Sequence, residues 1–242
     1  MKISIAIAVF ISTSYLTTAQ TLGRVVTKGK ELTTTSSGKS SLTNDEVVSG
    51  LREALTTGAK TAVSSASVAD GFYKNQEIFI PWPAQASSMK EKLVKLGMQK
   101  QVTEFEESMN HAAEEAAQSA FDIFAGAVKE MSVSDGFAIL NGGDTAATHY
   151  LREKTTPALT EKFTPVIKAA MEKVRITEYW DPLVTTYNKI PGVTKQNPDL
   201  EAYVTEKAIN GLLLLISEQE AKIRRDPAAQ VTTLLQRVFG KG

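Results

Sequence analysis

Apolar residues recur at spacings of three and four along most of the chain, as in helices that bury one face. The first periodic stretch begins with a capping box at Thr43–Glu46, in which the Thr43 hydroxyl and the Glu46 carboxylate bind free amides at the start of a helix. This helix should run to about Ser65. The longest stretch, from Met98 to Met131, predicts one long central helix. Because this helix is rich in alanine, its apolar face is narrow and neighbouring helices can approach closely.

Caps, glycines and prolines divide the rest of the chain. Between Val68 and Ala84 we expect a loop whose one strand-like piece, Glu77–Ile80, runs into Pro81-Trp82-Pro83, where prolines favour extended backbone. The run Leu212–Ile216 leaves no polar face, so other helices should surround it. Further helices are expected from about Ser88 to a left-handed cap at Gly97, from Ser132 to Asn141, from Asp144 as N-cap to Lys154, from Thr156-Pro157 to Val174 with a kink or split at Pro165, from Ile176 to Lys189, from near Asp199, and again from Asp226-Pro227.

Eight or nine helices without a repeat of fixed period predict a single all-α domain over residues 43–242. Residues 20–42 are rich in Thr, Ser, Gly and Lys, a composition typical of a flexible linker. Residues 1–19 resemble a secretory signal peptide, with one cation at Lys2, an apolar run to about Leu16, and small residues at Thr17 and Ala19. The sequence thus predicts a soluble protein of the periplasm or the secreted fraction, with no transmembrane segment in its mature chain.

Charge and cysteine content narrow the function further. Basic and acidic residues number 27 each, and loss of residues 1–19 would remove only Lys2 among them, so no basic surface for nucleic acid is expected. The chain has no cysteine, so it has neither a disulfide nor a thiol for a lipid anchor. The predicted mature protein is therefore held together by packing alone.

Four strings carry a resemblance to a known family. They are FYKNQEIFIPWP (72–83), ESMNHAAEEAA (107–117), ILNGGDTAATHYLREKT (139–155) and the stretch from DLEAYVTEKAINGLLLL to DPAAQVTTLLQRVFG within 199–240. Over residues 43–242 the chain resembles an uncharacterised bacterial envelope family catalogued only as a domain of unknown function. The resemblance implies a mostly helical exported or periplasmic protein and no particular reaction. His111 departs from the Arg or Lys usual in that family, which argues against an essential ligand there.

Two His-x-x-x-Glu pairs, His111 with Glu115 and His149 with Glu153, could each face one side of a helix as metal ligands do. A di-iron bundle would need two Glu-x-x-His units, but positions 108 and 146 are Ser and Ala. We therefore expect solvated or cap-region histidines, and neither a metal nor a cofactor.

Five polar residues remain as site candidates. Glu107, Asn110 and Glu114 form a stripe beside the alanine-rich face; they could supply acid–base groups in a dry cleft, although a solvated helix face is the simpler expectation. Asn141 and Asp144 flank two glycines at a helix start, where amides can bind an anion, although a tight turn needs the same residues. The aromatic residues Trp82, Tyr179, Trp180 and Tyr187 could line a groove or close the edge of the core, which we favour.

Three functional classes stay open. The first is a non-enzymatic binding protein that encloses a lipid-like or other amphipathic small molecule beside the 98–131 helix. The second is a structural or partner-binding protein of the cell envelope. The third, which the sequence favours least, is an enzyme that uses Glu107, Glu114 and Asp144. For the first class the expected ligand-binding residues are Ile78, Ile80, Trp82, Met109, Ala113 and Ala116.

Overall fold

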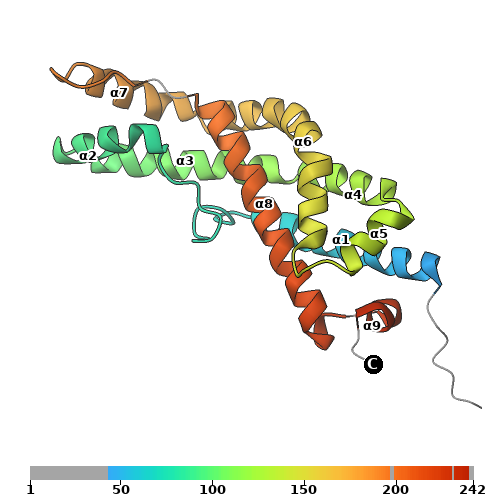
Figure 1. Ribbon diagram of the computed structural model, residues 1–242. Coiled ribbons are helices and arrows are strands. Elements are labelled where there is room, and N and C mark those ends of the chain that lie inside the picture. The colour runs from blue at the N-terminus through green and yellow to red at the C-terminus, as the bar shows by residue number, and fades with distance from the viewer. Residues whose placement is uncertain (1–42, 197–198, 231, 240–242) are drawn as a thin grey trace, which may run out of the picture. The chain divides into compact units, whose positions relative to one another are not determined.

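The computed structural model describes residues 43–196, 199–230 and 232–239, so the predicted signal peptide and linker lie outside the described residues. Within these ranges the chain forms α-helices and two short 3-10 turns and contains no strand, which confirms the all-α prediction (Figure 1). No helix in the described ranges is both long and apolar enough to cross a membrane. The helices are α1 (Asn44–Ala66), α2 (Ser87–Lys95), α3 (Gln99–Ala117), α4 (Ala120–Glu130), α5 (Val133–Leu140), α6 (Ala146–Lys173), α7 (Ile176–Asn188), α8 (Leu200–Arg225) and α9 (Thr233–Phe239), with 3-10 turns at Ala84–Ala86 and Pro227–Ala229.

Local cap signals form as the sequence predicts. At the start of α1 the Glu46 amide donates to the Thr43 hydroxyl at 3.2 Å, and the Thr43 amide donates to the Glu46 carboxylate at 2.9 Å. Ser132 and Asp135 make the same reciprocal pair before α5. After α2, Gly97 has φ +81 and its amide bonds to Val94, the left-handed end expected there. These helix ends are decided by atoms a few residues apart.

The prediction of one helix from Met98 to Met131 is wrong, because the helix breaks between α3 and α4. At the break the Ser119 hydroxyl and the Ser119 amide both donate to the Ala116 carbonyl, at 2.8 and 3.1 Å. A side-chain hydroxyl that bonds a nearby carbonyl competes with the helical hydrogen-bond ladder. The apolar spacing continues across the break, which is why periodicity alone predicts a single helix.

The opposite correction applies to α6, which is one helix where two were predicted. Both Pro157 and Pro165 lie inside it, although each lacks the amide hydrogen that a helix interior uses. One face buries Leu151, Leu159 and Phe163 against neighbouring helices, so tertiary packing carries the helix through both prolines. Figure 1 shows α6 bending along its length.

The predicted N-cap at Asp144 is also wrong. Thr145 occupies that position without a side-chain hydrogen bond, and Asp144 pairs instead with Arg225. The free amides of α6 are bound by a distant carboxylate: Ala147 and Thr148 donate their N–H groups to Glu220 of α8 at 2.9 and 2.8 Å. The start of α6 is therefore capped from another helix.

Helix α8 crosses the others and packs against α6, α1 and α3 (Figure 1). Asp199 caps its start as predicted, accepting from the Ala202 amide at 3.0 Å. The expectation that other helices surround the leucine run is wrong at one position, because Leu214 is 41% exposed. Asp226 accepts from the Ala228 amide but begins only a 3-10 turn, and α9 starts later at Thr233, so the predicted helix start at Asp226-Pro227 is also wrong.

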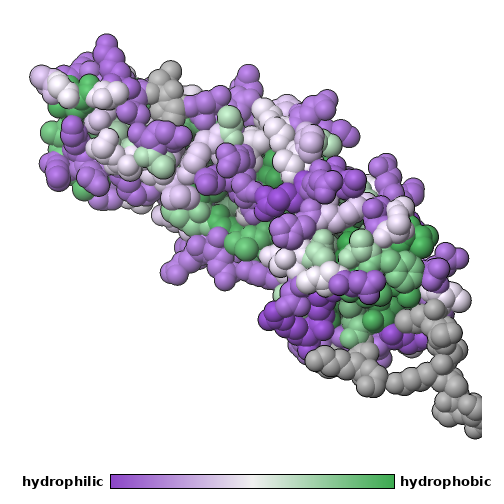
Figure 2. All heavy atoms as spheres, in the orientation of Figure 1, coloured by the Kyte–Doolittle hydropathy of each residue, from purple (hydrophilic) through white to green (hydrophobic). Residues whose placement is uncertain are grey.

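Residues 67–83 form a loop of turns that lies against α3 and α8. The strand-like piece Glu77–Ile80 is not a strand, because the amides of Ile78 and Phe79 fold back onto the Asn75 carbonyl at 3.3 and 2.8 Å. Gly211 of α8 lets the loop approach closely, since a Cβ there would lie 3.0 Å from Phe72. Elsewhere hydrophilic side chains cover most of the face seen in Figure 2. The large apolar side chains that the described ranges leave exposed are scattered along the sequence: Val68, Leu96, Val133 and Leu214.

Candidate functional site

Asn110 and Glu114, two of the five polar site candidates, anchor the 67–83 loop to α3. Asn110 is fully buried and pairs with the backbone of Ile80 as a strand would: its Oδ1 accepts from the Ile80 amide at 2.8 Å, and its Nδ2 donates to the Ile80 carbonyl at 3.0 Å. Its second amide hydrogen goes to the Glu106 carbonyl at 2.8 Å. The Asn110 side chain therefore holds the loop.

Glu114 is also buried, and its carboxylate accepts three backbone amides from the loop. Phe72 and Tyr73 donate to Oε1 at 3.0 Å each, and Asp70 donates to Oε2 at 3.2 Å. Its remaining contact is with His111, whose Nδ1 lies 2.7 Å from Oε2. With four partners on its two oxygens, this carboxylate shapes the turn at Asp70, which has φ +65. It plays a structural part in this arrangement.

His111 sits between two carboxylates of α3. Its Nδ1 faces Glu114, its Nε2 lies 3.5 Å from Glu107, and its ring lies beside Tyr73 with centroids 5.9 Å apart. Burial lowers the pKa of His111, but the hydrogen bonds and negative charges of Glu114 and Glu107 outweigh burial, so the pKa lies above its ordinary value of 6.5. The imidazolium form is thus favoured by its surroundings.

The His-x-x-x-Glu spacing does not assemble a ligand pair. Glu115 binds Lys173 at 2.6 Å, and the exposed Glu153 lies 3.9 Å from Lys154. His149 is exposed. Among the described residues no group of three or more His, Asp or Glu side chains is arranged so that it could hold a metal ion.

In the turn at Asn141–Asp144 the Asn141 and Gly142 amides are bonded to carbonyls of α5. Asn141 is exposed and ends α5, and Asp144 lies outside the cap. The anion at the start of α6 is Glu220 itself. Arg224, one turn further along α8, donates from Nε to the Glu220 carboxylate at 3.0 Å. An internal carboxylate fills the place where a bound anion was considered.

The six apolar candidates, Ile78, Ile80, Trp82, Met109, Ala113 and Ala116, are all buried in the main core. Trp82 packs edge-on against Phe105 with ring centroids 4.7 Å apart, and Phe105 stacks on Trp180 at 4.7 Å. Tyr187 is buried as well. The structure therefore brings the loop and the alanine-rich face of α3 together, as the ligand-binding hypothesis expects. Their side chains, however, pack in the core.

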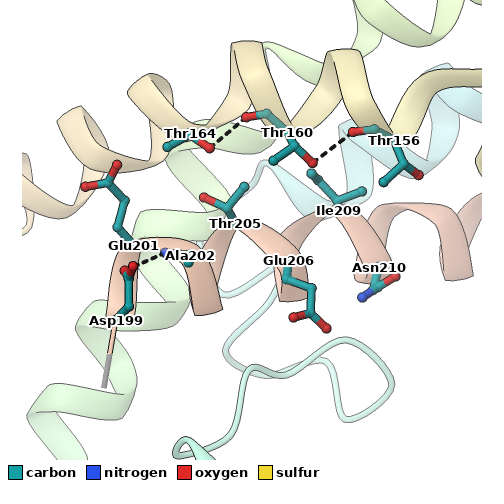
Figure 3. A pocket seen from close by; sticks show the side chains of 10 residues that line it. All are labelled: Thr156, Thr160, Thr164, Asp199, Glu201, Ala202, Thr205, Glu206, Ile209 and Asn210. Carbon is teal, nitrogen blue, oxygen red and sulfur yellow. Dashed lines mark hydrogen bonds between the residues drawn. The ribbon is translucent and has the colours of Figure 1, made fainter. Parts of the chain in front are cut away.

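A groove that sequence reasoning missed lies between α6 and the first turns of α8 (Figure 3). Its volume is about 400 Å³. Thr156, Thr160 and Thr164 line it from α6, where they form one row along the helix face. The opposite wall comes from α8 and its cap: Asp199, Glu201, Ala202, Thr205, Glu206, Ile209 and Asn210.

A family model described as "Protein of unknown function (DUF4197)" matches residues 41–240. The chain belongs to the DUF4197 family. Membership confirms the resemblance to a family catalogued only as a domain of unknown function, and the family description names no reaction. No curated protein and no solved structure matches the chain.

In this DUF4197 protein the hydroxyls of four described threonines line the groove, three of them bonded to the backbone of α6. The Thr156 hydroxyl donates to the Arg152 carbonyl at 2.6 Å, and Thr160 and Thr164 each donate one turn back at 2.8 and 2.7 Å. Thr205 lines the groove but is only 2% exposed, and its hydroxyl has no hydrogen-bond partner among the described residues. A buried hydroxyl without a partner is uncommon and invites a functional explanation.

One signal in the sequence could have revealed the groove. Threonines at positions 156, 160 and 164 are spaced by four, so they share one face of any helix that includes them. All three lie in the helix predicted from Thr156-Pro157 and precede the kink or split predicted at Pro165, so the row itself is visible in the sequence. The acidic wall could not be read in this way, because only the tertiary contact of α6 with α8 places it opposite the threonines.

Proposed function

We propose that this DUF4197 protein is an exported, non-catalytic binding protein that takes an apolar or amphipathic small molecule into the α6–α8 groove. The observation that carries the proposal is the groove itself: about 400 Å³ of space, within the range of ligand pockets, between two helices. Threonine methyl groups, Ala202 and Ile209 supply apolar surface, while hydroxyls and carboxylates supply polar contacts. Small-molecule sites commonly combine the two.

Catalysis has less support. Glu114 already accepts three amides and contacts His111, while Asp144, just before α6, is paired with Arg225 at the end of α8. Glu107 remains on α3 beside His111. Glu107 and Glu114 thus share His111 as a partner, and Asp144 pairs with Arg225. Because backbone amides already occupy the Glu114 carboxylate, acid–base chemistry has less support here than binding in the groove.

Export rests on the N-terminal sequence alone. Residues 1–19 have the charge, apolar run and small residues of a secretory signal, and cleavage is expected before Gln20. Expression with this leader in a Gram-negative host should place the protein in the soluble envelope fraction with Gln20 as its first residue. N-terminal sequencing that returns Met1 on membrane-bound material would refute export.

A paired titration tests the groove. Wild type should bind one or more fluorescent fatty-acyl or isoprenoid probes saturably, and Ala202→Trp should abolish that binding because Ala202 is exposed and lines the groove. Ala158→Trp is the matched control, since Ala158 is exposed on α6 but does not line the groove. Circular dichroism checks that both variants stay folded.

Two results would contradict the proposal. Absence of saturable binding by wild type would favour the structural or partner-binding class instead. Binding that survives Ala202→Trp but is lost in Ala116→Trp would place the ligand against α3, with the Ile78–Trp82 segment as one wall, as the sequence-based hypothesis has it. The two tryptophan variants therefore separate the two sites.

A further inference from the structure

We infer that the α6–α8 groove selects ligands whose polar end is a primary alkylammonium group. This inference rests on the proposed binding function and specifies the chemistry of the same groove. It is carried by the hydrogen-bonding state of the threonines, by the charge of the α8 wall and by the unpartnered Thr205 hydroxyl.

The threonine row offers acceptors and no free donors. Each hydroxyl of Thr156, Thr160 and Thr164 has one hydrogen, and each gives it to a backbone carbonyl within α6. What each oxygen can still offer a ligand is a lone pair. A ligand that meets this wall must therefore donate hydrogen bonds to it.

The opposite wall is negatively charged. Asp199, Glu201 and Glu206 line the groove, and none of the residues that line it is Lys, Arg or His. A helix start ordinarily favours an anion, but here the Asp199 carboxylate already occupies the Ala202 amide. An anionic head group would meet three carboxylates, whereas a cation would be attracted by them.

Two basic residues on the helices that form the groove have contacts of their own. Arg152 donates to the Asn210 side chain at 2.6 Å, so the Asn210 oxygen at this end of the groove is already used. Lys207 lies over the Tyr203 ring, 5.6 Å from its centroid. Among the described residues, the groove is thus lined by three carboxylates and by no basic side chain. In Figure 3 Glu201 extends toward the Thr164 end of the threonine row, whereas Glu206 points away from it.

Thr205 supplies an independent observation that points to a ligand. Its side chain extends from α8 toward the threonine row of α6, and its hydroxyl is buried without a partner among the described residues (Figure 3). Leaving a buried hydroxyl unpaired costs stability, and an ammonium N–H would give its oxygen a partner. A primary ammonium has three donors, enough to bond Thr205, one threonine of α6 and one carboxylate together.

Three octyl compounds that differ only in the head group test the inference. n-Octylammonium, 1-octanol and octanoate are titrated against the full chain by calorimetry at pH 7 in a buffer free of amines, where the amine is protonated. Octylammonium should bind at least tenfold more tightly than octanol, and octanoate should bind most weakly. The preference should shrink as salt is raised, because exposed charges are screened.

Two variants assign the preference to the groove. Thr205→Val keeps the shape and removes the oxygen, and it should weaken octylammonium at least fivefold while octanol binding is unchanged. Glu206→Gln, at an exposed position, should reduce the ratio of octylammonium to octanol affinity without affecting folding. Thr61→Val on α1 and Glu91→Gln on α2 are matched controls at exposed positions outside the groove and should leave the ratio unchanged.

The outcomes are distinguishable. Equal affinity for the three head groups, or a preference for octanoate, overturns the ammonium inference but leaves the groove as a binding site. A preference that neither Thr205→Val nor Glu206→Gln changes also overturns it, because the cation then binds elsewhere. If none of the three compounds binds, and the fluorescent probes fail as well, both the inference and the proposed function are overturned.

Discussion

Replacing Glu114 by alanine should release the 67–83 loop at a large cost in stability. The change leaves the Phe72 amide, which is buried, and the Asp70 and Tyr73 amides, which are partly buried, without their acceptor. An unpaired buried donor costs about 1–3 kcal/mol, and the two partly buried amides can recover some bonding from water. Together with the lost contact to His111, we expect the free energy of unfolding to fall by about 3–5 kcal/mol.

Glutamine at the same position should cost less. Phe72 and Tyr73 both donate to Oε1, which the glutamine carbonyl can replace, whereas Oε2, which accepts from Asp70, becomes a donor. Glu114→Gln should therefore lower the free energy of unfolding by about 1–2 kcal/mol. The neighbouring Glu115→Ala is the control, since its exposed pair with Lys173 is worth at most about 1 kcal/mol.

Urea unfolding followed by tryptophan fluorescence measures these differences, because Trp82 and Trp180 are both buried in the core beside Phe105. Hydrogen exchange of the amides at residues 70, 72 and 73 should accelerate in Glu114→Ala before the rest of the chain opens. The reasoning is refuted if Glu114→Ala costs no more than Glu115→Ala, or if alanine is tolerated better than glutamine. In either case the carboxylate would not be what holds the loop.

Three further predictions concern single residues. Because folding raises the pKa of His111, its imidazolium stabilises the fold below the ordinary value of 6.5, and this contribution is lost as pH rises through the folded pKa. His111→Gln should therefore lower the free energy of unfolding, measured in urea, more at pH 5.5 than at pH 9, and a loss independent of pH would contradict this. Burial and then the nearby Glu77 raise the pKa of Glu218, so its ionised form is disfavoured in the fold; Glu218→Gln should raise the melting temperature at pH 8 and lose that gain near pH 4, and no gain at pH 8 would count against it. Ala116→Trp should overpack the fully buried α3 face and cost about 1–3 kcal/mol or more in thermal or urea unfolding, whereas an unchanged stability would reveal space there.

Contacts close in sequence made several elements predictable. The capping boxes at Thr43 and Ser132 and the left-handed Gly97 depend on atoms within a few residues of each other, and the structure forms all three. The apolar periodicity likewise predicted an all-α chain, because the same spacing that buries one face of a helix is visible in the residues themselves. Periodicity did not locate the break at Ser119, where a side-chain hydroxyl competes with the helical ladder while the apolar spacing continues.

The candidate site shows the limit of this local information. For the stripe of Glu107, Asn110 and Glu114 on α3, the expectation of a solvated helix face is wrong at Asn110 and Glu114, which are buried. Whether such residues meet solvent, a substrate or the backbone depends on which segment packs there. The 67–83 loop occupies Asn110 and Glu114 with its own amides, an arrangement that involves residues 30 to 44 positions apart. No helical period encodes that contact.

What the sequence by itself determined is therefore the set of helices with strong local caps, together with membership of the DUF4197 family. Only the tertiary structure decided that Glu220 caps α6 from a position 73 residues away, that α6 continues through two prolines, and that a row of threonines and three carboxylates line one groove. The physical reason is one of range. Caps and periodicity use neighbours within one or two helical turns, whereas buried carboxylates, partnerless hydroxyls and grooves arise from which helices pack together.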